Sequence, residues 1–157
     1  MRGALYLPEW MLKAERAARQ LRATTAGTRG AHHALYVVLL KDTRRVGRWG
    51  LYVGETALDP DLRFDQHKTG YKASRHVNRF GVRLLPQLFE HFNPLCRWEA
   101  VELEPALAEA FRYAGVPWVE PLSPCAPTKH AEPASFGALA SAFCHVQTLV
   151  DAAASVD

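Results

Sequence analysis

The sequence predicts an α+β domain in which helices flank a small antiparallel sheet of about three strands. Two apolar stretches carry this prediction. Residues 33–41 form a continuous apolar run with adjacent valines, and residues 50–55 form a second run after a polar turn that contains glycine. Short apolar runs bounded by turn residues are typical of buried strands, and a turn between them indicates a hairpin.

Local start and stop signals predict the helices around this hairpin. Asp59 can cap a helix and Pro60 suits its first turn, so a helix is expected over residues 60–69. Gly70 is a suitable residue to end it. Apolar spacing predicts a helix over residues 8–25. Further helices are expected over residues 73–80 and about 97–114, each followed by a glycine, and over the alanine-rich residues 134–154.

A third strand is predicted over residues 82–89, at an edge of the sheet because Pro86 has no backbone N–H to donate. The length of the chain suits one domain with a substantial core. The organisation that we expect is a helical extension, a central domain, and a proline-rich loop followed by a last helix. These cover residues 1–30, 31–120 and 121–157.

Composition excludes several classes of protein. No apolar run approaches the roughly 20 residues that span a bilayer, and the N-terminus has no secretory signal pattern. The three cysteines are scattered and form no CxxC pair, which argues against a thiolate zinc site and for a reducing compartment. We therefore expect a cytoplasmic protein without a membrane partner.

Charge is divided unevenly along the chain. Residues 1–83 carry 16 basic and 7 acidic side chains, whereas residues 84–157 carry 3 and 9. The basic excess includes residues 63–83. Such a division fits a polyanion bound near a metal-holding carboxylate, and it equally fits two solvated faces of opposite sign.

Two tyrosines stand on the predicted hairpin. Tyr36 and Tyr52 can share one face of the sheet if the turn falls near residues 43–48, and Gly54 suits a close approach of backbone or ligand. A tyrosine can act as a base or donor where a neighbouring charge acts on its pKa. The alternative is that both tyrosines are core residues whose hydroxyls reach solvent.

Arg63 and His67 are four residues apart, so they share a face of the predicted helix. An arginine in this place can bind a phosphate through two of its N–H groups. In the alternative interpretation the two residues are a solvated surface pair, and His67 caps the C-terminus of the helix.

Acidic residues supply the candidate metal ligands in the second half of the chain. Glu104 shares a helical stripe with Leu107 and Phe111, where a carboxylate is costly unless it is paired or binds a cation. Pro105 leaves a second option open, in which the helix starts at residue 105 and Glu104 is its cap. The acidic cluster consists of Glu99, Glu102, Glu104 and Glu109.

The order of these motifs along the chain resembles the GIY-YIG nuclease superfamily, including a group of small bacterial GIY-YIG proteins. The similarity covers Ala34 to about Trp118. The stretch between the two tyrosines holds 15 residues, so the hairpin loop is longer than is usual in the family. The motifs are Ala34-Leu35-Tyr36, Tyr52-Val53-Gly54, Arg63-Phe64-Asp65-Gln66-His67 and Glu99-Ala100-Val101-Glu102-Leu103-Glu104.

The resemblance implies a metal-dependent endonuclease that hydrolyses phosphodiester bonds in nucleic acid, DNA rather than RNA. It implies that Glu104 holds one Mg²⁺ or Mn²⁺, with Glu102 and Glu99 as alternatives. The implied catalytic residues are Tyr36, Tyr52, Arg63, His67 and Glu104, and the implied nucleic-acid-binding residues are Lys68, Lys72, Arg75 and Arg79.

A second interpretation stays open. In it, the chain keeps the fold but is catalytically silent, and it binds nucleic acid or another protein. The terminal helices could then serve a homodimer or a protein partner.

Overall fold

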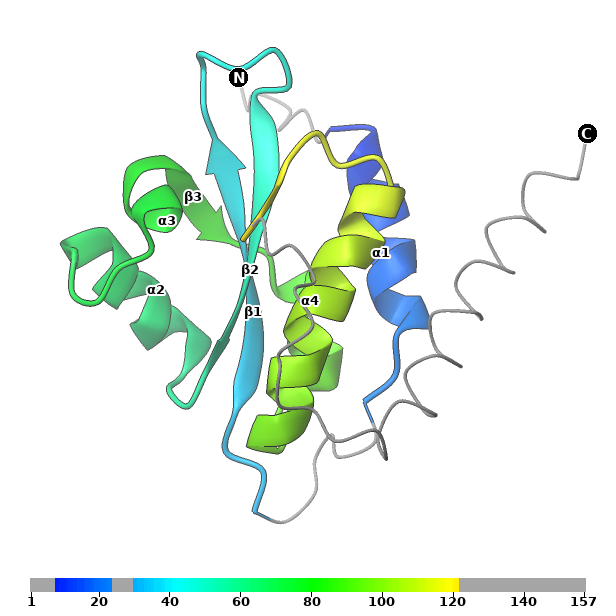
Figure 1. The fold of residues 1–157 in the computed structure, drawn as a ribbon, viewed down its shortest axis with the longest axis vertical. Helices are drawn as coiled ribbons and strands as arrows, with labels where there is room; N and C mark the ends of the chain where they lie inside the picture. Colours follow the sequence, from blue (N-terminus) through cyan, green and yellow to red (C-terminus); the bar gives the residue numbers. More distant parts are fainter. Residues whose placement is uncertain (1–7, 24–29, 122–157) are drawn as a thin grey trace, which may run out of the picture. The chain divides into compact units, whose positions relative to one another are not determined.

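Within residues 8–23 and 30–121, the part of the chain that the computed structural model describes, helices cover both faces of a four-stranded sheet (Figure 1). All these residues belong to one compact unit, residues 1–123. The elements are α1 (Trp10–Gln20), β1 (Ala34–Lys41), β2 (Trp49–Thr56), α2 (Pro60–Thr69), α3 (Arg75–Phe80), β3 (Gly81–Leu84), η1 (Pro86–Leu88), η2 (Glu90–Phe92), α4 (Arg97–Tyr113) and β4 (Val119–Glu120), where η1 and η2 are 3₁₀ helices.

The sheet has the order β3-β1-β2-β4. The predicted hairpin is confirmed, because β1 and β2 pair antiparallel with Tyr36 opposite Gly54. The expectation of an antiparallel sheet of about three strands is wrong in one respect: β4 pairs parallel with β2 at Leu51 and Tyr52, so the sheet is mixed. A strand of two residues leaves no periodic signal in the sequence.

The helix that carries Arg63 and His67 starts and ends where its local signals predict. The Asp59 carboxylate accepts hydrogen bonds from the backbone N–H groups of Asp61 at 2.9 Å and Leu62 at 3.4 Å. Gly70 ends α2 with φ at +90°, a conformation that favours glycine.

Two predicted elements are shorter than expected. α1 ends at Gln20, and β3 ends at Leu84 rather than continuing to residue 89. Leu85 still donates its N–H to Val37, at 2.9 Å, but Pro86 has no N–H with which to extend the ladder and begins η1 instead. The predicted last helix, 134–154, and the loop before it, beyond Pro121, lie outside the described residues.

Pro105 lies inside α4, so the option of a helix that starts at residue 105 is wrong. The proline lacks the N–H that would bond the carbonyl of Val101. Ala100, Leu107 and Phe111 are fully buried on the same helix, and this burial offsets the missing hydrogen bond. Glu104 therefore projects from the middle of a packed helix.

The two faces of the sheet have different covers. In Figure 1, α2 and α3 lie on one side of the strands and α1 and α4 lie on the other. Side chains alternate along a strand, so Tyr36 and Tyr52 point to the α2 and α3 side, which we call the tyrosine face. No helix in the described part of the chain is long and apolar enough to cross a membrane.

Candidate active site

Both tyrosines lie on the tyrosine face with their ring centroids 6.0 Å apart. The ring of Tyr36 crosses over Gly54, where an added Cβ would lie 2.5 Å from the ring Cζ. Glycine at this position makes the room that the phenol occupies. Tyr36 is 1% exposed, whereas Tyr52 is half-buried, so Tyr52 is the tyrosine that solvent can reach.

His67 is buried and bonds to Tyr36, so it is neither a surface residue nor an exposed helix cap. Its Nε2 lies 2.7 Å from the Tyr36 hydroxyl oxygen, and its Nδ1 accepts the backbone N–H of Ser74 at 2.9 Å. Burial, and then the charge of Arg63, lowers the pKa of His67 to about 4. The neutral ring therefore carries its proton on Nε2 and donates it to Tyr36.

This tautomer gives the hydrogen bonds one direction. Because the Tyr36 oxygen accepts from His67, its own O–H can donate to Tyr52. Burial raises the pKa of both phenols, most strongly that of Tyr36. Hydrogen bonds from Tyr36 and from the Ser74 side chain act against burial at Tyr52, since they lower its pKa.

Arg63 is held in place next to this chain of hydrogen bonds. Its Nη1 donates to Gln66 Oε1 and its Nη2 to the carbonyl of Lys72, both at 3.1 Å. After the larger effect of burial, the Arg63 charge changes the pKa of His67 and of both tyrosines, so the guanidinium lies close to all three rings. A half-buried, oriented arginine of this kind suits a phosphate.

Glu104 lies on α4, which covers the side of the sheet opposite to the tyrosine face (Figure 1). Burial raises the pKa of Glu104 to about 7; the Glu55 carboxylate raises it further, and a hydrogen bond from the Glu55 backbone opposes them. The charge of Glu104 also contributes to raising the pKa of Tyr52, after the larger effect of burial. Glu104 thus lies near both Glu55 and Tyr52.

Glu55 is a second carboxylate at this edge. Its Oε2 is buried and, in the described structure, has no hydrogen-bond partner; His33 Nε2 lies 3.9 Å from it. Of the other predicted ligands, Glu102 is exposed and Glu99 is buried. Across residues 8–23 and 30–121, no group of three or more His, Cys, Asp or Glu side chains forms a metal cluster.

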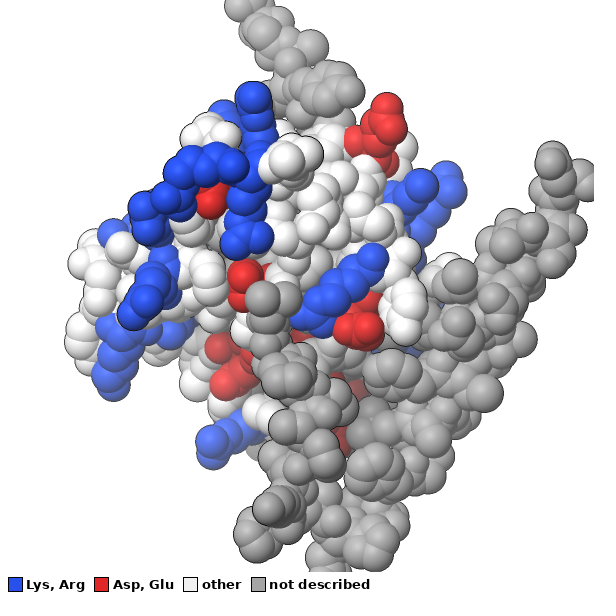
Figure 2. Space-filling model, turned by 45° about the horizontal axis from the view of Figure 1, so that its top comes forward, with Lys and Arg blue, Asp and Glu red and all other residues white. Residues whose placement is uncertain are grey.

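The four predicted nucleic-acid-binding residues, Lys68, Lys72, Arg75 and Arg79, are all exposed. Lys68 is partly engaged, because its Nζ bonds the carbonyls of Gly81 at 2.9 Å and Asn78 at 3.4 Å. Figure 2 shows Lys and Arg gathered on the left of the view, the side on which α2 and α3 lie in Figure 1.

The structure brings Tyr36, Tyr52, Arg63 and His67 into contact distance and places Glu104 near Tyr52. Sequence reasoning missed Ser74 and Glu55. Ser74 precedes α3 and Glu55 directly follows Gly54, so both adjoin predicted motifs, but neither carries a signal of its own.

Comparison with known proteins adds no relative. No protein-family model matches the chain, and no match was found among curated proteins or among solved structures. The functional proposals rest on the residues of this chain and on the order of its motifs.

Proposed function

We propose that this protein is a metal-dependent endonuclease of the GIY-YIG type, a cytoplasmic enzyme that hydrolyses phosphodiester bonds in nucleic acid, DNA rather than RNA. One observation carries the proposal. Two phenols and an oriented guanidinium, remote from one another along the chain, lie close together on the tyrosine face, and the charge of the Glu104 carboxylate acts on one of the phenols, Tyr52. These are the groups that the reaction needs: contacts for the attacking water, a cation for the phosphate and a ligand for a metal.

The carboxylates fit a divalent cation. Glu104 is held next to Glu55, its pKa is raised, and the buried Glu55 Oε2 has no hydrogen-bond partner within the described structure. A cation would relieve both effects, and Mg²⁺ needs only one or two protein carboxylates. When bound there, Mg²⁺ or Mn²⁺ stabilises negative charge on the leaving oxygen.

Of the remaining residues, Arg63 and Tyr52 act directly on the substrate and the water. Arg63 binds the non-bridging oxygens of the phosphate. Tyr52, the more exposed phenol, contacts the attacking water, and its oxygen is oriented by the hydrogen that Tyr36 donates. His67 acts on Tyr36 rather than on the substrate, because it is buried and its Nδ1 is bonded to the Ser74 backbone.

A cleavage assay tests this function. Purified protein is incubated with single-stranded and duplex DNA and RNA in Mg²⁺, Mn²⁺ or EDTA, beside Glu104→Gln and Arg63→Ala. Each variant is expected to lose about 100-fold or more in rate. The matched control is Glu102→Gln, an exposed carboxylate on the same helix, which should keep the wild-type rate. Equal loss in Glu104→Gln and Glu102→Gln would contradict the assignment of the metal ligand.

A catalytically silent nucleic-acid-binding module is the alternative. Burial raises the pKa of both phenols, which favours the protonated forms over a base. Tight binding of DNA without cleavage in any metal would support this alternative.

A further inference from the structure

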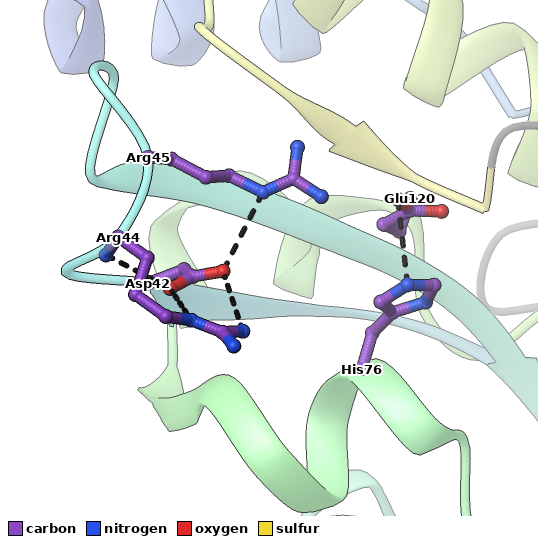
Figure 3. A network of polar contacts seen from close by, with 5 residues as sticks. All are labelled: Asp42, Arg44, Arg45, His76 and Glu120. Atoms are coloured by element: carbon purple, nitrogen blue, oxygen red, sulfur yellow. Dashed lines mark hydrogen bonds and ion pairs between the residues drawn. The ribbon is translucent and has the colours of Figure 1, made fainter.

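The enlarged loop between β1 and β2 is built around one buried acidic residue. Asp42 is 6% exposed, and it accepts hydrogen bonds from Arg44 N at 3.0 Å and Arg44 Nε at 3.1 Å. Arg45 Nε lies 3.6 Å from the other carboxylate oxygen. The hydrogen bond from Arg44 holds the pKa of Asp42 below its ordinary value, so both arginines keep a fixed counter-charge (Figure 3).

Both arginines nevertheless stay open to solvent, with 63% of the Arg44 side chain and 46% of the Arg45 side chain exposed. Each also lies against an aromatic ring. The Arg45 guanidinium is 4.1 Å from the Trp118 ring, and that of Arg44 is 5.7 Å from the Phe80 ring. The loop thus presents two cationic groups in defined positions.

These arginines lie on the same side of the sheet as the candidate active site. Trp118 covers Gly50, where a Cβ would lie 2.5 Å from the indole. Gly50 and Tyr52 are two residues apart on β2 and so point to the same face.

Positive charge continues from the loop onto α3. Residues 41–49 carry four basic side chains and one acidic side chain. On α3, Arg75 and Arg79 are exposed, and His76 lies 3.6 Å from the buried carboxylate of Glu120, as Figure 3 also shows. Both the β1–β2 loop and α3 therefore carry exposed basic side chains, in keeping with the basic surface in Figure 2.

A purely structural role accounts for only part of this arrangement. One arginine would neutralise Asp42, but the loop supplies two and holds both against rings on the tyrosine face. We propose that the β1–β2 loop is a second phosphate-binding subsite, in which Arg44 and Arg45 bind the sugar–phosphate chain at a phosphate other than the one held by Arg63. The proposal rests on the proposed function for the identity of the ligand.

Val46 offers a test that leaves the loop intact, because its relative exposure is 106% and it stands next to Arg45. Binding of a fluorescein-labelled DNA duplex is measured by anisotropy in EDTA, where metal-dependent cleavage does not interfere, over a range of salt concentrations. Val46→Lys should tighten binding and steepen the salt dependence by about 0.9 in log–log slope, and Val46→Glu should weaken binding several-fold. The matched control pair is Leu12→Lys and Leu12→Glu on α1, 66% exposed on the other side of the sheet, which should leave binding unchanged.

Arg44→Gln and Arg45→Gln provide a second measurement. Glutamine keeps an N–H donor for Asp42 but removes the charge, so each variant should lower the salt slope by about 0.9 if it has lost one phosphate contact. Thermal melting in the same buffer checks that the variants are folded.

The possible outcomes separate the two proposals. If the wild type cuts DNA but neither the Val46 pair nor the arginine variants change binding, the loop proposal is wrong and the nuclease proposal stands. If the Val46 pair shifts binding in opposite directions while no metal supports cleavage, the loop proposal stands and the nuclease proposal falls.

Discussion

The Tyr36 hydroxyl oxygen lies 2.7 Å from His67 Nε2, and this bond joins β1 to α2 beneath the candidate active site. Both residues are 1% exposed. The bond links a strand tyrosine to a helix histidine 31 positions later in the chain, which neither motif alone indicates.

The burial of His67 makes the protein sensitive to acid. Burial, followed by the Arg63 charge, lowers the pKa of His67 to about 4, below its ordinary value near 6.5. Because the imidazole binds a proton at a higher pH in the unfolded chain than in the folded protein, the free energy of unfolding decreases as pH falls. His67→Gln should therefore lose less stability than the wild type between about pH 7 and about pH 5, by about 1–2 kcal/mol. Urea unfolding at both pH values measures the difference. The exposed His32→Gln serves as the control and should follow the wild type.

Glu104 has the opposite sign of pH dependence. Its pKa is raised to about 7, chiefly by burial, so its contribution to stability is present below the ordinary carboxyl pKa and is lost as pH rises through 7. In EDTA, Glu104→Gln should be more stable than the wild type at about pH 8, by roughly 1–2 kcal/mol after allowing for solvent screening, and equal to it near pH 4. Thermal melts at the two pH values test this, with Glu102→Gln as the partner variant. If the wild type is as stable as Glu104→Gln at about pH 8, burial does not disfavour the ionised Glu104 carboxylate, and this prediction is wrong.

The two tyrosines should differ in their effect on cleavage. Tyr52→Phe removes the hydroxyl of the half-buried tyrosine, which the proposed function assigns to the attacking water, so the rate should fall by about 10²–10³-fold. Tyr36→Phe removes a buried hydroxyl whose proposed role is to orient Tyr52, so a smaller fall, about 10-fold, is expected. Initial rates at saturating metal compare the two variants, and melting curves separate lost activity from lost folding. Equal rates for the two variants would contradict the roles assigned here.

Gly54→Ala tests the close packing under Tyr36. The added Cβ would lie 2.5 Å from the ring, so the phenol must shift and its bond to His67 must lengthen. A loss of about 1–3 kcal/mol in the free energy of unfolding is expected. In a double-mutant cycle with Tyr36→Val, the smaller valine leaves room for the added Cβ. Gly54→Ala should therefore cost much less unfolding free energy in the Tyr36→Val background than in the wild type. Simple additivity in that cycle would mean that the ring is not the obstacle.

Local signals predicted some of this structure well. The bounds of α2 follow from Asp59, Pro60 and Gly70, whose effects on the backbone act within a few residues. The same holds for the shared face of Tyr36 and Tyr52, because the alternation of side chains along a strand is a property of the strand itself.

What sequence reasoning missed depends on pairs of residues that the chain brings together only when folded. β4 is two residues long and pairs parallel with a strand some 70 residues earlier. The burial of Asp42 beneath Arg44 and the approach of Glu55 to Glu104 likewise arise from tertiary packing. In α4, packing of Leu107 and Phe111 prevails over the local preference of Pro105.

Two glycines on β2 have a joint consequence for strand registration. Gly50 and Gly54 flank Tyr52 on the same face, and each leaves a hollow filled by a ring from elsewhere, Trp118 in one and Tyr36 in the other. If β2 slid by two residues along β1, polar and apolar faces would be preserved, but Tyr36 would meet the side chain of Tyr52 or Thr56 instead of a hollow. The absence of side chains at Gly50 and Gly54 therefore favours the observed register of β1 and β2 over registers shifted by two residues.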